Sequence, residues 1–274
     1  GAGSGKTYTL VKVVRWIIEN DPSSLVACIT YTNAAVKEIA QRVNHENLRV
    51  STIHDFLWDN IKNYQKELCN VVIKLLNTPD SGLQISGMEV IPTDYYSNRE
   101  EPVGISYQEH TNLKEGILSH DEVIIVAHEM FKEYPKLSDI LKSRYPFIMI
   151  DEYQDTSDLQ ESFINLISNN NVYMVGDIKQ SIYRFRNANP ILFKNKYDNY
   201  SKSNGGMKID LVKNFRSRFE VLHDINTLFN LIMDNNIGGA EYSESHNMVF
   251  GNTLYVEKGN TEQNNNLEIY NYEY

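Results

Sequence analysis

The first residues whose types and spacing suggest chemistry stand at the start of the sequence, Gly1-Ala2-Gly3-Ser4-Gly5-Lys6-Thr7. Glycines in such a run let backbone N–H groups turn toward a phosphate, and the N-terminus of a following helix adds partial positive charge. Gly3, Ser4 and Gly5 would wrap the phosphates of a nucleotide. Lys6 would reach the β- and γ-phosphates, and Thr7 would offer its hydroxyl to Mg²⁺.

The alternative for this run is a chance glycine-rich stretch ahead of a helix. The residues that follow favour phosphate binding, because they repeat apolar side chains at helical spacing from Leu10 to Ile18. In the pattern G-x-x-x-x-G-K-[ST], the first glycine would fall five positions before Gly5, ahead of the first residue. We therefore expect a fragment that opens inside the loop, without the strand that leads into it.

Two adjacent carboxylates, Asp151 and Glu152, follow the apolar run Phe147–Ile150. Four apolar residues in a row predict a strand buried on both faces. With a phosphate loop upstream, Asp151 would hold the Mg²⁺ shell and Glu152 would orient or deprotonate the attacking water. The alternative is an ordinary strand–helix boundary with acidic capping residues.

A third candidate stretch runs from Gln180 to Arg186 and interleaves aromatic and arginine side chains. Gln180, near the end of a predicted strand at 172–175, could reach a γ-phosphate. Tyr183 and Phe185 could stack on bases while Arg184 and Arg186 meet backbone phosphates. The alternative is a half-buried amphipathic segment with solvated arginines.

The elements that must position these residues read as an α/β protein. A helix over 8–20 precedes a buried strand over 25–31, and Asn33 can cap a helix over 34–43. Strands alternating with helices predict a doubly wound parallel sheet, in which ligands bind at the carboxyl ends of the strands. Thr30, Tyr31, Thr32 and Asn33 stand at such an end.

Residues 48–57 predict a short strand, a polar turn and the start of a helix. His54 in this stretch is either a capping or core histidine or a ligand contact. Residues 58–117 change character: a helix over 58–77 leads into short polar segments with a possible hairpin near 83–107. We interpret this stretch as an insertion that carries no evident chemistry.

Helix returns over 118–143, where Ser119 and Glu122 form a capping box and the apolar positions share one face. A polar linker is predicted over 195–206 and a strand over 207–212. A helix beginning near Lys213 then continues to about Met233. Arg216 at this junction is either an arginine finger across a domain interface or a surface arginine. The tail has weak strand patterns at 253–256 and 267–272.

Composition sets wider bounds. The chain has 274 residues, 41% hydrophobic and 23% charged, with a formal net charge of -10. This charge argues against a chain-wide electrostatic grip on nucleic acid but leaves room for a local basic strip. The 2 cysteines, Cys28 and Cys69, are expected to be buried free thiols, which fits a reducing cytoplasm. No apolar run approaches the ~18–20 residues of a membrane span.

Six motifs occur in a fixed order, and together they are more specific than any one of them. They are Gly-Ser-Gly-Lys-Thr, Thr-Tyr-Thr-Asn-Ala-Ala, Ser-Thr-Ile-His-Asp-Phe, Ile-Asp-Glu-Tyr-Gln-Asp-Thr, Val-Gly-Asp-x-x-Gln-Ser-Ile-Tyr-x-Phe-Arg and Asn-Phe-Arg-Ser. The series resembles the N-terminal half of a superfamily 1 DNA helicase of the UvrD/Rep type. The stretch 214–250 resembles the AddA branch, one component of a helicase–nuclease that processes DNA breaks.

The resemblance implies a role for each matching residue. Lys6 and Thr7 would bind phosphate and Mg²⁺, with Asp151 as the metal carboxylate and Glu152 as the catalytic base. Gln180 would sense the γ-phosphate. Arg216 would be an arginine finger, with Phe215 beside the adenine. A single-strand DNA track would be lined by Tyr31, Thr32, Asn33, His54, Tyr183, Phe185 and Arg186. Phe185 stands where the family often has Trp.

The resemblance also implies a domain plan: a RecA-like ATP-binding domain at 1–57 and 118–205, an inserted, mostly helical subdomain at 58–117, and the start of a second RecA-like domain at 206–274. The glutamine that reads adenine and the later motifs are absent. We therefore expect weak nucleotide binding and no unwinding from this stretch alone. The implied activity is ATP-dependent 3′→5′ movement on single-stranded DNA and duplex unwinding in repair.

The implied cofactors are ATP and Mg²⁺. The implied partners are single-stranded and duplex DNA and a nuclease subunit or domain. Two alternatives stay open. A non-motor P-loop ATPase or kinase needs an acceptor pocket and a lid but no aromatic and arginine strip. A DNA-binding module with a vestigial ATP site is disfavoured by the intact set of ATP-site residues.

Overall fold

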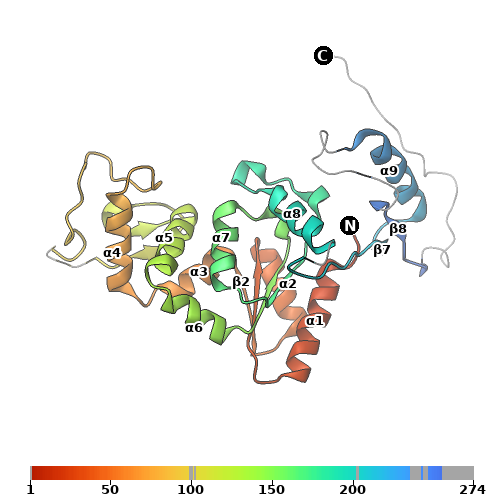
Figure 1. Cartoon of the computed structure of the whole chain (residues 1–274), viewed down its shortest axis with the longest axis horizontal. Coiled ribbons are helices and arrows are strands. Elements are labelled where there is room, and N and C mark those ends of the chain that lie inside the picture. The colour runs from red at the N-terminus through yellow and green to blue at the C-terminus, as the bar shows by residue number, and fades with distance from the viewer. Residues whose placement is uncertain are drawn as a thin grey trace, which may run out of the picture. The chain divides into compact units, whose positions relative to one another are not determined.

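The structure is a computed structural model, and it describes residues 2–98, 101, 103–201, 204–234, 242 and 246–254 (Figure 1). The chain divides into two compact units. We call them the sheet unit, which comprises Val13–Glu152 and Thr156–Met174, and the loop unit, which comprises Gly1–Lys12, Tyr153–Asp155 and Val175–Tyr274. Helix α1 (Lys6–Asn20) begins in the loop unit and ends in the sheet unit.

A four-stranded parallel sheet forms the centre of the sheet unit, in the order β2-β1-β5-β6. Its strands are β1 (Val26–Thr30), β2 (Leu48–Thr52), β5 (Phe147–Ile150) and β6 (Val172–Met174). All five residues of β1 are buried, as expected for a central parallel strand. The predicted α/β class with a parallel sheet is confirmed.

The helices that follow β1 and β2 begin directly at the strand ends. Thr32, not Asn33, is the N-cap of α2 (Asn33–Val43), because its hydroxyl accepts a hydrogen bond from the backbone N–H of Ala35. Thr52 likewise caps α3 (Ile53–Ile61), so no separate polar turn stands between β2 and α3. The prediction that Asn33 caps its helix was wrong by one residue, since both neighbours are good capping residues.

The stretch expected as one helix over 58–77 is two helices, because α3 ends at Ile61 and α4 spans Gln65–Leu76. The hairpin expected near 83–107 is absent from the described residues of that stretch. Instead β3 (Ser106–Tyr107) pairs in parallel with β4 (Ile117–Leu118), across the 3₁₀ turn η1 (Leu113–Glu115). Gly116 leaves this turn in the left-handed region, with φ 66°, which returns the chain into β4.

The helix expected over 118–143 is also two helices, α5 (His120–Glu133) and α6 (Lys136–Arg144). Pro135 separates them, since proline disfavours helical backbone in the residue before it. The Ser119–Glu122 capping box is confirmed, and the predicted apolar face of α5 is buried. Lys74 of α4 pairs with Glu129 and Glu133 of α5 at 2.9 and 2.8 Å and so joins these two helices.

Among its described residues, the loop unit has the 3₁₀ turns η2 (Tyr153–Asp155), η3 (Ile178–Gln180) and η4 (Arg184–Arg186). Helix α8 (Pro190–Ser201) follows, so the linker expected over 195–206 is largely helical. Proline suits the first position of a helix, where its missing N–H costs nothing. The remaining elements are β7 (Lys213–Asn214), α9 (Phe219–Ile232) and β8 (Val249–Phe250).

The strand expected over 207–212 is wrong for the described residues. The carbonyl of Val212 accepts from the N–H of Val249 at 3.0 Å, but the strand residues that pair are the next two, in β7. The helix expected from Lys213 begins six residues later, at Phe219. Thr253 and Leu254 form no strand, and the rest of the two tail patterns lies outside the described residues. The predicted boundaries of the motor domain, insertion and second domain stay a prediction.

Both cysteines are free thiols, Cys28 buried and Cys69 half-buried. Within the described part of the chain, no helix has the length and apolar character needed to cross a bilayer.

Candidate nucleotide and nucleic-acid site

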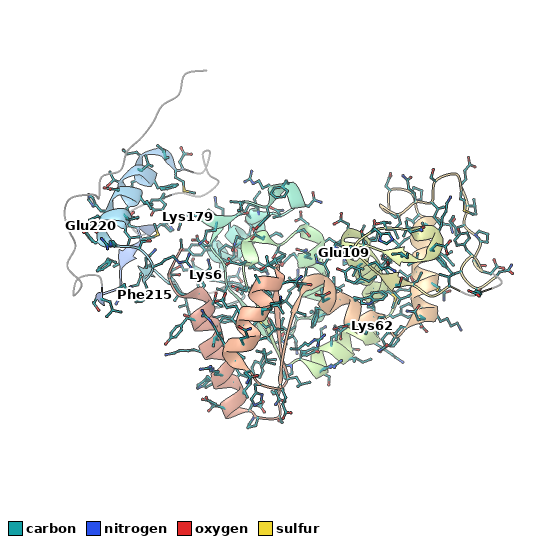
Figure 2. The ribbon with its side chains drawn as sticks, turned by 180° about the vertical axis from the view of Figure 1, so that it is seen from behind. Lys6, Lys62, Glu109, Lys179, Phe215 and Glu220 are labelled. Carbon is teal, nitrogen blue, oxygen red and sulfur yellow. The ribbon has the colours of Figure 1, made fainter. Side chains whose placement is uncertain are left out.

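The glycine-rich run folds as a loop that leads straight into a helix (Figure 2). Gly3 and Gly5 adopt left-handed backbone with φ 64° and 78°, which a residue with a side chain adopts at a cost. Ser4 between them is buried. Helix α1 begins at Lys6, and the N–H of Thr9 donates to the carbonyl of Gly5 at 2.8 Å. Lys6 and Thr7 therefore occupy the helix N-terminus, where an anion is favoured.

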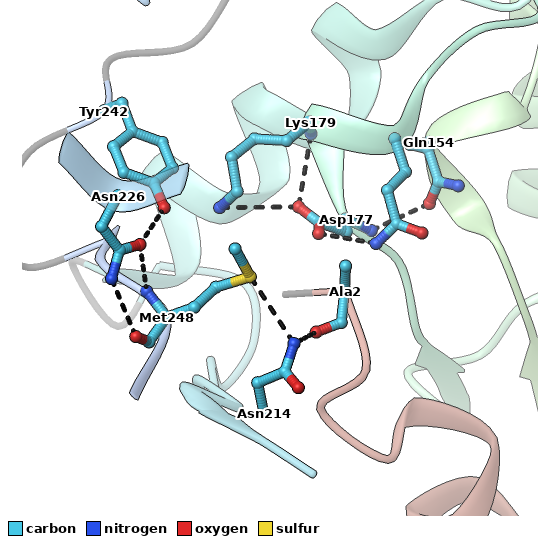
Figure 3. Close-up of polar contacts among 9 residues, drawn as sticks. Ala2, Gln154, Asp177, Lys179, Asn214, Asn226, Tyr242 and Met248 are labelled. Atoms are coloured by element: carbon cyan, nitrogen blue, oxygen red, sulfur yellow. Dashed lines mark hydrogen bonds and ion pairs between the residues drawn. The ribbon is translucent and has the colours of Figure 1, made fainter. Parts of the chain in front are cut away.

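The segment Asn214–Arg216, predicted to carry the arginine finger, lies against this loop within the loop unit. The N–H of Phe215 donates to the carbonyl of Gly3 at 2.9 Å, and the side-chain amide of Asn214 donates to the carbonyl of Ala2 at 2.8 Å (Figure 3). The Phe215 ring is half exposed and Arg216 is exposed. The structure thus brings two predicted site residues, Phe215 and Arg216, to the phosphate loop.

Gln180, the predicted γ-phosphate sensor, belongs to η3 and is held by Asp177. Its side-chain amide donates to Oδ2 of Asp177 at 2.7 Å, and Lys179 Nζ lies 3.6 Å from Oδ1 of the same carboxylate (Figure 3). Burial raises the pKa of Asp177, but the charge of Lys179, the Gln180 hydrogen bond and the charge of Lys6 outweigh it, so the pKa is lowered. Asp177 is therefore a buried carboxylate that holds the side chain of Gln180.

Gln154 is a residue to which sequence reasoning gave no role. It is 2% exposed, and its Oε1 accepts a hydrogen bond from the N–H of Asp177 at 2.9 Å. The backbone carbonyl of Gln154 accepts from the hydroxyl of Ser181 at 3.2 Å. A Cβ on Gly176 would lie 2.6 Å from Oε1 of Gln154, so this contact needs glycine there. The sequence signal was present, since Gln154 belongs to one of the six motifs.

Asp151 and Glu152 end β5 in the sheet unit. Asp151 is 3% exposed, and its N–H donates to the carbonyl of Ile29 in β1 at 3.0 Å. Burial and the Asp151 carboxylate together raise the pKa of the Cys28 thiol. The N–H of Glu152 donates to Oδ1 of Asp151 at 3.0 Å, and Glu152 has φ 51°. Such a conformation costs about 1–3 kcal/mol in a non-glycine residue and clusters at functional sites.

In each unit, the donor groups are of the kinds that suit a magnesium nucleotide. Positive-φ glycines, a lysine and a threonine stand at a helix N-terminus, and a buried carboxylate ends a parallel strand. Backbone N–H groups and a lysine suit phosphate oxygens, while hydroxyl and carboxylate oxygens suit Mg²⁺.

Tyr31, Thr32 and Asn33 follow β1 in the sheet unit. The hydroxyl of Tyr31 lies 2.6 Å from Oγ1 of Thr156, a buried residue of the Asp151–Thr156 motif. Thr32 and Asn33 are exposed where α2 begins. This stretch therefore presents polar groups at the carboxyl end of β1, as the sequence predicted.

His54 lies in the first turn of α3, and its ring meets that of His120 at 4.7 Å between centroids. Burial is the main cause that lowers its pKa to about 4, the nearby His120 lowers it further, and Asp55 opposes both. His54 is therefore neutral at pH 7. Tyr107 continues the row of rings, 5.5 Å from His120.

The strip Tyr183–Arg186 lies in the loop unit. The rings of Tyr183 and Phe185 are 5.8 Å apart and inclined by 56°. Phe185 is 75% exposed, Tyr183 is half-buried and Arg184 is exposed. The side chain of Arg186 lies outside the described part of the structure. An exposed ring of this size is the kind of group on which a base can stack.

Comparison with known proteins agrees with this arrangement. The model of the UvrD/REP helicase N-terminal domain family matches residues 1–86 and 62–201. Together these matches cover more than half of the chain, and the chain belongs to that family. The predicted resemblance to UvrD/Rep-type helicases is confirmed.

Three curated relatives share one name, which describes each of them as the A subunit of an ATP-dependent helicase/nuclease. The protein of Staphylococcus haemolyticus (strain JCSC1435) is 33% identical over 267 residues, which are 88% of this chain and 21% of the relative. That of Lactococcus lactis subsp. lactis (strain IL1403) is 44% identical over 150 residues, 53% of this chain and 12% of the relative. That of Exiguobacterium sibiricum is 39% identical over 150 residues, 52% of this chain and 13% of the relative. The chain spans about a fifth or less of their length, and their shared name supports the predicted AddA branch.

Proposed function

We propose that this chain supplies the first ATP-binding domain of a DNA motor, which couples ATP hydrolysis to 3′→5′ movement on single-stranded DNA and to duplex unwinding in repair or recombination. The observation that carries the proposal is the family match, because it covers both the phosphate loop and the Tyr183–Arg186 strip. The direction of movement rests on the resemblance alone.

Each residue of the ATP-site motifs has a proposed role. Lys6 and the loop glycines bind the phosphates, Thr7 and Asp151 hold Mg²⁺, and Glu152 takes the proton of the attacking water. Mg²⁺ bound with ATP neutralises the charge that develops on the phosphate oxygens. The buried position of Asp151 and the strained backbone of Glu152 support these assignments.

Gln180 and Arg216 are the proposed γ-phosphate contacts. Gln180 senses the γ-phosphate, Arg216 stabilises its transition-state charge and Phe215 stacks beside the adenine. The contact of Phe215 with Gly3 and the Asp177–Gln180 hydrogen bond support this arrangement.

The DNA track comprises two sets of residues. Tyr183 and Phe185 stack on bases, with Arg184 and Arg186 at backbone phosphates. Tyr31, Thr32, Asn33 and His54 also contact the single strand. Because His54 is neutral at pH 7, its contact is a hydrogen bond or a stacking contact rather than an ion pair.

Two further parts of the proposal concern the whole protein. A nuclease subunit or domain works with the motor, as the relatives' name suggests for them. The protein acts in the cytoplasm, where free thiols such as Cys28 and Cys69 persist.

The test is the ATPase activity of the full-length protein with and without single-stranded DNA, together with strand displacement on a partial duplex. We expect DNA to stimulate hydrolysis and ATP to be required for displacement. Hydrolysis that DNA does not stimulate would favour a non-motor ATPase or kinase, and DNA binding without hydrolysis would favour a module with a vestigial ATP site. Residues 1–274 alone should bind nucleotide weakly and unwind nothing.

A further inference from the structure

Asn214 makes more contacts than a residue beside an arginine finger requires. It is 3% exposed, although Phe215 and Arg216 next to it reach the surface. Its Oδ1 accepts hydrogen bonds from the N–H groups of both Arg216 and Ser217, each at 2.8 Å. Its Nδ2 donates to the carbonyl of Ala2 at 2.8 Å and lies 3.7 Å from the sulfur of Met248 (Figure 3). One buried amide thus joins two chain segments 212 residues apart.

The phosphate loop is shaped to accept this segment. Gly3 occupies a variable position of the pattern G-x-x-x-x-G-K-[ST], so phosphate binding alone does not explain a glycine there. A Cβ on Gly3 would lie 2.8 Å from Cβ of Arg216 and 2.9 Å from Nδ2 of Asn214. The N–H of Phe215 also donates to the carbonyl of Gly3. The close approach is therefore a second reason for glycine at position 3, beside its left-handed backbone.

We propose that Asn214 is a positioning residue, whose amide sets where Arg216 stands relative to bound phosphate. The proposal rests on the proposed function, in which Arg216 contacts the γ-phosphate. The two ends of the amide have separate tasks: Oδ1 fixes the local turn that directs Arg216, and Nδ2 ties that turn to the phosphate loop. Without the hydrogen bond from Nδ2 to the carbonyl of Ala2, Arg216 keeps its local conformation but loses its fixed distance from the nucleotide.

Two substitutions separate these tasks. In Asn214→Asp, one carboxylate oxygen still accepts from Arg216 and Ser217, while the other faces the carbonyl of Ala2 and cannot donate to it. Asn214→Ser serves if the aspartate variant does not fold, because a hydroxyl can also accept within a turn but is too short to reach the loop. The matched control is Asn77→Asp. Asn77 likewise accepts from one backbone N–H and donates to two carbonyls, and it lies in the sheet unit.

The experiment is a double-mutant cycle of Asn214→Asp with Arg216→Ala in the full-length protein. The first readout is the affinity for a non-hydrolysable ATP analogue relative to ADP, and the second is kcat and KM for DNA-stimulated ATPase. Arginine fingers contribute about 10³–10⁵-fold to kcat. We expect Asn214→Asp to lower kcat and the preference for the ATP analogue by about 10-fold or more. In the Arg216→Ala background it should change either readout by less than about 2-fold, since interacting residues are not additive.

Full multiplicative effects in the double mutant would overturn the proposal, because Asn214 would then act independently of Arg216. The proposal would also be overturned if Asn214→Asp alone changed kcat and the preference for the ATP analogue no more than Asn77→Asp does. A wild-type protein without DNA-stimulated hydrolysis would defeat the proposed function instead. The nucleotide-affinity arm would still decide the role of Asn214, and loss of the preference on Arg216→Ala but not on Asn214→Asp would refute it.

Discussion

The segments around the glycine-rich loop and the Tyr183–Arg186 strip lie in the same compact unit but are held in different ways. Around the phosphate loop, Gln154, Asp177 and Asn214 are each at least 94% buried and bind backbone or side-chain partners. A few residues along the chain, Ile182 and Phe185 are 69% and 75% exposed. Hydrolysis needs groups fixed to within a fraction of an ångström, whereas stacking on successive bases needs an accessible ring. The difference in burial is the one that the two proposed tasks require.

The largest expected effect is that of Glu152→Gln on ATP hydrolysis. Glu152→Gln keeps the shape of the side chain but removes the proposed base, and general bases contribute about 10²–10⁴-fold. We expect kcat for ATP to fall by about that factor, with nucleotide and DNA affinity unchanged. Steady-state ATPase and nucleotide binding measure this, with the exposed Glu46→Gln as control. Full activity in the variant would remove Glu152 from its role.

The second largest expected effect concerns DNA binding by the Tyr183–Arg186 strip. Tyr183→Ala combined with Phe185→Ala removes both rings, and stacking contributes about 1–3 kcal/mol per base. Affinity for single-stranded DNA should fall about 10-fold or more, while nucleotide affinity stays constant. Fluorescence anisotropy with an oligonucleotide checks it. Trp16→Ala, which removes another exposed ring, should leave DNA affinity unchanged. Equal DNA affinity in the double variant would argue that the strip does not stack on bases.

The third prediction concerns the hydrogen bond between Gln154 and Asp177, which lies beside η3 (Ile178–Gln180). Gln154→Leu leaves the N–H of Asp177 buried without its acceptor, which costs about 1–3 kcal/mol. We expect the free energy of unfolding to fall by that amount and DNA stimulation of the ATPase to weaken. Urea unfolding measures the first effect, with the exposed Gln84→Leu as control. A variant as stable as the wild type would mean that the Gln154 contact does not support the loop.

The smallest effect concerns His54 in the sheet unit and its pKa of about 4. An unfolded histidine has a pKa of about 6.5, so below that pH the unfolded chain binds a proton that the folded chain refuses. Stability should therefore decline as pH falls from about 6.5 to 4 and level off below. For this partly buried ring, which solvent still screens, we expect about 1 kcal/mol. His54→Gln should flatten this dependence and the exposed His110→Gln should not. Urea unfolding at pH 7 and pH 5 distinguishes them.

Local rules predicted much of this fold. The apolar runs before Thr30 and Asp151 became neighbouring parallel strands, and the Ser119–Glu122 box became a helix cap. Both signals depend on a few adjacent residues. The failures involve distant partners. The stretch 207–212 alternates like a strand, but among the described residues its only strand-like contact is the Val212 carbonyl, which accepts from the N–H of Val249 in β8. β3 finds a parallel rather than a hairpin partner. Pairing depends on tertiary context, which a single sequence does not display.

The candidate site divides in the same way. Motif order predicted the residues from Lys6 to Arg216, because their chemistry is tied to short patterns. Gln154 and Asn214 belong to the same motifs but received no role, since their importance lies in backbone groups far along the chain. Only coordinates show that the amide of Gln154 meets Asp177 and that of Asn214 meets Ala2.

The close approach at Gly3 has a consequence for how this protein can evolve. Any side chain at position 3 would collide with Arg216 or Asn214, so the two segments constrain each other. A lineage that acquired a larger residue at position 3 would have to move or rebuild the arginine-bearing segment in the same period. Across relatives, substitutions at these two places should therefore arise as a pair, and a recombinant gene that joins them from divergent parents should inherit a mismatch.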